Sequence, residues 1–227
     1  MPRRPRTAAS TGFYHVVNRS VRKETLFTQP RDYRAFLAVL QAGVTRYEVP
    51  LVAYCVMKNH WHLLVGPLGK QRLSKVIQWV TSTHAARWHK FRGTTGQGPV
   101  YQGRFTSTPL DDIAALVPMS RYVERNARSA GLVPSAEDWP WCSLAQRLRG
   151  GGRVPLAAAA FLSSESWLGY VNATITSREH LRDAHTRQRA VRHRPLKRTS
   201  VPKLLKPVEK GSDPLKDPLK KKPVNDE

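Results

Sequence analysis

Residues 57–65, with the sequence MKNHWHLLV, place two histidines one residue apart in an apolar run that favours a β-strand. Side chains of a strand alternate between its faces, so His60 and His62 are expected on one face and Trp61 on the other. Two imidazoles in that arrangement can bind one divalent metal ion or flank one phosphate. They can equally be ordinary histidines on a polar face, and the rest of the chain must decide.

Around this stretch the sequence predicts four strands and two connecting helices. The expected elements are strands over 13–18, 49–56, 60–65 and 100–110, and helices from Pro30 to about 44 and over 73–91. The order β-α-β-β-α-β predicts an α+β, ferredoxin-like fold, which is an antiparallel four-stranded sheet with helices packed on one face. In this plan the strand that carries His60 and His62 is central in the sheet.

A third helix is expected from Ile113 to about Arg128. Tyr122 and Asn126 are four residues apart in it and share a face. If that face lies over the sheet, a hydroxyl and a carboxamide meet the two imidazoles. Such ligands suit Mg²⁺ or Mn²⁺, and a tyrosine beside a cation can attack a phosphodiester and form a phosphotyrosine. Glu124 is a fallback ligand, but it is two residues from Tyr122 and is expected to point elsewhere.

The composition indicates a polyanionic partner. The 227 residues include 38 Lys and Arg against 16 Asp and Glu, a formal net charge of +22. Nucleic acid is the first candidate partner, because no apolar stretch is long enough to span a membrane and no signal-peptide pattern is present. These features favour a cytoplasmic protein. The two cysteines, Cys55 and Cys142, exclude a disulfide framework, and Cys55 is expected in the core.

Changes in composition divide the chain into four parts. Residues 1–12 are expected to form a flexible basic arm, and 13–150 a single folded domain. A helical extension is expected over 151–193, with short helices at 156–162 and 177–192. Residues 194–227, rich in Lys and Pro, are expected to be a disordered basic tail.

Four segments, at 14–20, 57–64, 100–105 and 121–126, stand in the order seen in single-tyrosine HUH transposases. Over about 12–145 the sequence resembles the REP-associated tyrosine transposases in particular. The resemblance implies that His60 and His62 are metal ligands, that Asn126 is the third ligand and that Tyr122 is the nucleophile. It also implies an enzyme that uses Mg²⁺ or Mn²⁺ to cut and rejoin single-stranded DNA at hairpins or repeats. A bacterial, nucleoid-associated location follows, with the protein as a monomer or homodimer.

Two positions depart from the pattern of many relatives. Lys58 stands where they have proline, and Ala127 follows Asn126 where they have a second proline. A helix that lacks this proline is expected to run slightly longer.

Basic and aromatic residues outside this constellation are candidate DNA contacts, on the pattern of phosphate-binding and stacking surfaces. They are Arg3, Arg4, Arg6, His15, Arg19, Arg87, Trp88, Lys90, Arg104 and Arg128. A structural role for His15 and a solvated surface for the others remain open. The alternative function is non-enzymatic binding of structured nucleic acid on the same fold. A rolling-circle initiator or relaxase is less favoured, since the chain has no Gly-rich phosphate loop with Lys.

Overall fold

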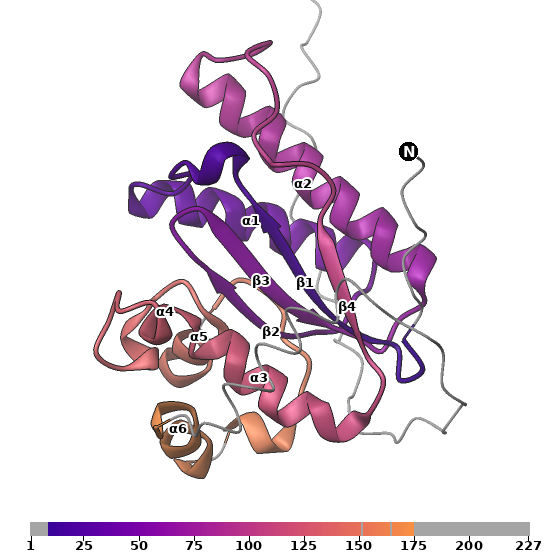
Figure 1. The fold of residues 1–227 in the computed structure, drawn as a ribbon, viewed down its shortest axis with the longest axis vertical. Coiled ribbons are helices and arrows are strands. Elements are labelled where there is room, and N and C mark those ends of the chain that lie inside the picture. The colour runs from indigo at the N-terminus through magenta and orange to yellow at the C-terminus, as the bar shows by residue number, and fades with distance from the viewer. Residues whose placement is uncertain (1–8, 151, 164, 175–227) are drawn as a thin grey trace, which may run out of the picture.

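The computed structural model describes residues 9–150, 152–163 and 165–174 of the chain. Four antiparallel strands form one sheet in the order β2-β3-β1-β4 (Figure 1). The strands are β1 (Phe13–Arg19), β2 (Leu51–Val56), β3 (His60–Val65) and β4 (Thr106–Leu110). Because β3 lies between β2 and β1, the prediction of a central strand for His60 and His62 is confirmed.

Two long helices, α1 (Pro30–Arg46) and α2 (Lys70–Arg92), cover one face of the sheet (Figure 1). Trp61 of β3 lies on this face, where its ring packs on Phe36 of α1 with centroids 5.7 Å apart. The indole N–H of Trp61 donates to the hydroxyl of Tyr101 (3.2 Å), which is hydrogen-bonded in turn to Nδ1 of His84 in α2 (2.7 Å). A buried polar chain therefore joins the sheet to the helix layer.

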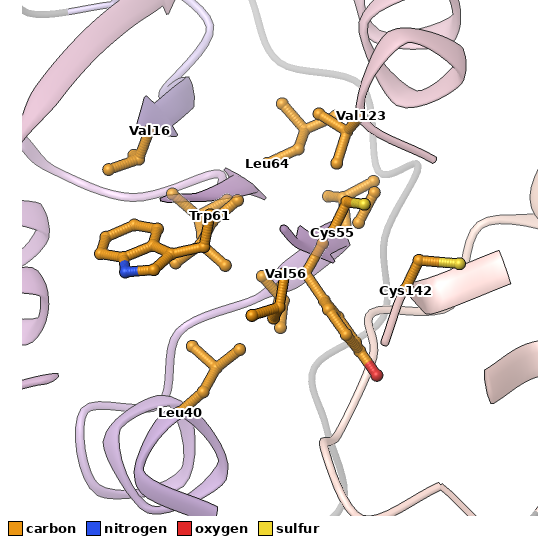
Figure 2. Packing of buried hydrophobic residues seen from close by; sticks show 14 of the residues in the cluster. Val16, Leu40, Cys55, Val56, Trp61, Leu64, Val123 and Cys142 are labelled. Atoms are coloured by element: carbon orange, nitrogen blue, oxygen red, sulfur yellow. The ribbon is translucent and has the colours of Figure 1, made fainter. Parts of the chain in front are cut away.

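A third helix, α3 (Leu116–Glu124), covers the opposite face. Its Val123 lies next to Leu64 of β3, whereas Val56 of β2 faces Leu40 of α1 (Figure 2). The expectation from the fold plan that helices pack on one face is therefore correct for α1 and α2. In contrast, α3 packs on the face that carries His62. The alternation of β3 side chains accounts for this division.

Several boundaries differ from the sequence predictions. The strand expected over 100–110 is limited to β4, because Gly103 has a φ of +142° and the chain turns there. Tyr101 pairs with Ser20 in an isolated bridge. Pro109 is tolerated in β4 because this strand lies at the edge of the sheet. A 3₁₀ turn, η1 (Val21–Lys23), follows β1.

The helix expected from Ile113 to about Arg128 is present but irregular. It is three pieces: a 3₁₀ turn η2 (Ile113–Ala115), then α3, then a short α4 (Asn126–Ser129). Asp112 caps the start, since its carboxylate accepts from the N–H of Ala114 at 2.9 Å. At Arg125, between α3 and α4, the backbone stays in the right-handed helical region with φ −79° and ψ −7°, and the N–H of Ser129 donates to the Arg125 carbonyl at 2.9 Å, so the helical path continues into α4.

Four short elements follow: η3 (Ala136–Asp138), α5 (Ser143–Arg149), η4 (Ala160–Ser163) and α6 (Glu165–Asn172). The helix expected at 156–162 is present only as η4, and α5 and α6 were not predicted individually. The helix expected at 177–192, most of the basic arm and the basic tail lie outside the described residues. Within the described part of the chain, no helix is long and apolar enough to cross a bilayer.

Glu124 anchors these short elements to α3. Its carboxylate is fully buried and accepts from Ser143 Oγ (2.6 Å) and from the indole N–H of Trp167 (2.8 Å), and it forms an ion pair with Arg147. Arg121 of the same helix donates to the carbonyl of Ala173 at 2.8 Å. The end of α3 is thereby held by α5 and α6, which limits how α3 can sit on the sheet.

Candidate active site

The two histidines of β3 lie on one face of the sheet, as their spacing predicts. Their ring centroids are 5.0 Å apart. In the sheet His62 stands opposite Val17 of β1 and Cys55 of β2, and His60 stands opposite Arg19 at the end of β1. The pair is therefore central in the sheet and is supported by neighbouring strands on both sides.

His15 of β1 contacts His62 directly. Its Nε2 lies 2.9 Å from Nδ1 of His62, and the two rings are parallel within 2° with centroids 5.2 Å apart, as in a hydrogen bond between ring edges. Only 6% of His15 is exposed. A DNA contact by His15 remains a prediction, and its burial favours the structural alternative.

The predicted nucleophile lies against these imidazoles. The ring of Tyr122 in α3 stands edge-on to His62, with centroids 5.7 Å apart at 87°, and to His15, with centroids 5.5 Å apart at 88°. Tyr122 is half-buried, so its ring packs against the histidines while part of the side chain is accessible to solvent. Three residues that are far apart in the sequence thus form one cluster.

Asn126 follows Tyr122 by four residues but belongs to a separate helical segment. It is half-buried and is the first residue of α4, directly after Arg125. Arg125 keeps helical backbone angles, so the chain from Tyr122 to Asn126 still makes about one helical turn. The role of Asn126 as third metal ligand stays a prediction.

Hydrogen bonds orient the ring of His60. Nδ1 of His60 lies 2.7 Å from Oδ1 of Asn59, and Nδ2 of Asn59 donates to the carbonyl of Lys23 at 2.8 Å. A carbonyl only accepts, so the Asn59 amide group must point its NH₂ at Lys23 and its oxygen at His60. The oxygen can only accept, and Nδ1 of His60 is therefore the donor, which leaves the lone pair of this ring on Nε2.

The local electrostatics keep two of the imidazoles neutral. Burial lowers the pKa of His15 to about 4. Burial, and then the positive charge of Arg19, lowers the pKa of His60 to about 4. Metal ions bind the neutral form of imidazole, so both effects maintain the form that a metal requires. Arg19 also brings a positive charge beside His60.

The donor atoms at the cluster fit a partly hydrated divalent ion. Among the described residues, no group of three or more His, Cys, Asp or Glu side chains is placed to hold a metal. The described residues therefore do not form a closed, structural site of the zinc type. Two imidazoles with a carboxamide or water would leave positions open for phosphate oxygens, as a catalytic site requires.

A family model described as "Transposase IS200 like" matches residues 8–126, which is just over half of the chain. The chain belongs to the IS200-like transposase family. The family places it among enzymes that act on DNA. The matched region contains His60, His62 and Tyr122 and ends at Asn126.

One solved structure shares the fold of this IS200-like transposase. The structure of a REP-associated tyrosine transposase bound to a REP hairpin matches with a TM-score of 0.53 and 17% identity, over 78% of this chain and all of that one. A candidate transposase from Deinococcus radiodurans R1 matches with a TM-score of 0.39 and 16% identity, over 54% of this chain and 96% of that one. No curated protein matches the chain.

The other predicted DNA contacts of this transposase are scattered. Arg87 and Lys90 are exposed on α2, which lies on the sheet face opposite Tyr122, and Arg104 is exposed before β4. Trp88 is half-buried and donates to the carbonyl of Leu26 at 3.3 Å. Arg128 donates to the carbonyls of Pro134 (2.9 Å) and Asn172, which gives it a structural role. Arg3, Arg4 and Arg6 lie outside the described residues.

Sequence reasoning missed two features of this site. It left open a structural role for His15 but did not pair it with His62. The register of β1 on β3 brings them together, and period-two alternation alone could only place His15 on one face of its strand. It also gave Glu124 no partner, because Arg147 and Trp167 lie in helices that the pattern did not predict. Its expectation that Glu124 points away from Tyr122 agrees with the contacts of the carboxylate.

Proposed function

We propose that this chain is a metal-dependent single-stranded DNA endonuclease and strand-transferase, with Tyr122 as the nucleophile. The observation that supports this most directly is the edge-on contact of the Tyr122 ring with His62. A tyrosine beside candidate metal ligands is poorly explained as packing alone, since its side chain is only partly enclosed by the core.

The reaction is a transfer of one phosphodiester. Oη of Tyr122 gives up its proton and attacks the phosphorus, the bond to the leaving sugar oxygen breaks, and a proton passes to that oxygen, so that no net proton is gained or lost. The DNA remains joined to Tyr122 as a phosphotyrosine. Because one phosphodiester replaces another, attack by a DNA hydroxyl can reverse the step and rejoin a strand without ATP.

His60 and His62, with Asn126, are the residues we assign to hold Mg²⁺ or Mn²⁺. A bound divalent ion would polarise the phosphodiester and offset the charge that gathers on its oxygens. Arg19, opposite His60, would bind a neighbouring phosphate and so orient the strand. The ring contacts with His15 and His62 would hold the phenol ring of Tyr122 in place.

Hairpin-forming single-stranded DNA is the substrate we infer. The net charge of +22 suits a polyanion, and the transposase of similar fold was solved with a REP hairpin bound. We place this reaction in the bacterial cytoplasm, at the nucleoid.

The test is formation of a covalent adduct. The full chain is incubated with a labelled DNA hairpin carrying single-stranded flanks and Mn²⁺, and the products are separated under denaturing conditions. We expect a protein–DNA adduct whose modified peptide contains Tyr122. Tyr122→Phe should abolish the adduct and retain hairpin binding by fluorescence anisotropy, whereas Tyr47→Phe, at the end of α1, should behave as wild type.

Two results would contradict the proposal. An undiminished adduct in Tyr122→Phe would remove Tyr122 from the reaction. Tight hairpin binding without any adduct or cleavage in wild-type protein would favour the alternative, a non-enzymatic protein that binds structured nucleic acid.

A further inference from the structure

His15 of β1 offers His62 of β3 a buried hydrogen-bonding partner on the neighbouring strand. Its Nε2 and Nδ1 of His62 are 2.9 Å apart, and the two rings are parallel within 2°. One of these nitrogens must donate and the other accept, because two lone pairs or two N–H groups would repel at this distance. The geometry alone allows either direction.

At His60, in contrast, the neighbouring contacts fix which atom donates the hydrogen bond. The carbonyl of Lys23 fixes the amide of Asn59, and the amide oxygen fixes Nδ1 of His60 as a donor. A metal ligand on this ring must therefore be Nε2. For His62 to bind the same ion from the same strand face, its Nδ1 must be the donor as well, so that its lone pair is on Nε2.

We propose that His15 is a positioning residue that accepts a hydrogen bond from Nδ1–H of His62, and that Asn59 does the same for His60. The two acceptors set both imidazoles in one tautomer and turn Nε2 of each ring toward the metal. This inference rests on the proposed function. Partners of this kind hold a ligand ring in orientation and raise its basicity, and their loss typically weakens metal affinity by about 10–100-fold.

The acceptor role also constrains His15 itself. An imidazole whose Nε2 accepts carries its own proton on Nδ1. The inference therefore specifies the Nδ1–H tautomer for three rings at once. Packing without a directed hydrogen bond would not require the same tautomer in all three.

Heteronuclear NMR of ¹⁵N-labelled, metal-free full-length protein tests the inference without any reaction. We expect His15, His60 and His62 to show the pattern of the Nδ1–H tautomer at neutral pH. An Nε2–H tautomer at His62 would overturn the role of His15. The same result at His60 would overturn that of Asn59.

Equilibrium binding of Mn²⁺ alone, followed by electron paramagnetic resonance, is the second readout. His15→Ala should weaken Mn²⁺ binding by about 10–100-fold. His15→Gln should recover much of the loss, because its amide oxygen can accept from His62. His84→Ala is the matched control, since His84 is also a buried, hydrogen-bonded histidine but lies on the other face of the sheet, and it should bind Mn²⁺ as wild type does.

The outcomes separate this inference from the proposed function. Wild-type adduct formation with unchanged Mn²⁺ affinity in His15→Ala would overturn the inference and leave the function intact. A wild-type protein that binds no Mn²⁺ would overturn the metal site, and with it the role of both partners in metal binding. If His15→Ala does not fold, the NMR pattern of the wild type and the affinity of His15→Gln decide.

Discussion

The ring of Tyr122 stands at 87° to that of His62, with 5.7 Å between the centroids. One residue comes from a helix and the other from a central strand, and neither is near the other in sequence. Because α3 is held at Glu124 and Tyr122 contacts both imidazoles, small changes on either side of α3 should affect the site.

Removal of either histidine of β3 should eliminate adduct formation. We expect His60→Ala and His62→Ala each to reduce it by more than the ~10–100-fold typical of an outer partner, because a ligand itself is lost. A chelator should have the same effect on the wild type, and added Mn²⁺ should reverse it. His89→Ala, a half-buried histidine at the end of α2, serves as the control. Metal-independent cleavage in the histidine variants would show that the ligands are assigned wrongly.

Glu124 should be critical for stability. Its carboxylate is buried with Arg147, so Glu124→Ala leaves a positive charge without its partner, at a cost of about 3–5 kcal/mol. Urea unfolding measures this loss. The exposed pair of Glu48 with Arg72 is the comparison, and Glu48→Ala should cost no more than about 1 kcal/mol. Similar losses in the two variants would mean that α3 is not anchored by this carboxylate.

Stability should fall as the pH is lowered below about 6.5. Burial lowers the pKa of His84 to about 4, so between these values the unfolded chain binds a proton that the folded chain does not. At pH 5 the contribution of His84 is a loss of about 2 kcal/mol relative to pH 7.5. Unfolding by urea at the two pH values should show a smaller difference for His84→Gln than for the wild type. An unchanged difference would contradict this assignment.

Arg104 and Arg128 should separate DNA binding from stability. Arg104 is exposed, and Arg104→Ala should weaken hairpin binding and lower the salt dependence by about one ion, with unchanged stability. Arg128 holds backbone carbonyls, so Arg128→Ala should lower the free energy of unfolding by about 1–3 kcal/mol. Anisotropy at several salt concentrations and urea unfolding measure both. If Arg128→Ala is as stable as the wild type but binds DNA weakly, Arg128 is a DNA contact and not a structural residue.

Much of the fold follows from local patterns. The alternation in 60–65 predicted which side chains share a face, and the apolar stripe that starts at Pro30 predicted α1. The strand prediction failed where backbone conformation interrupts a pattern, as at Gly103 before β4. Hydrophobic periodicity does not register such an interruption, because it depends on residue type and not on the backbone dihedral angles.

Residue types and their spacing were enough to predict the chemical groups of the candidate site and the strand face on which His60 and His62 lie. Both depend on residue type and on a period of two, which are local properties. Only the tertiary structure decided that His15 hydrogen-bonds to His62 and that Tyr122 stands against both rings. These contacts depend on the register of β1 on β3 and on the docking of α3 through Glu124. Such contacts join residues that can be more than 40 positions apart in the sequence, as Glu124 and Trp167 are, and no local pattern encodes them.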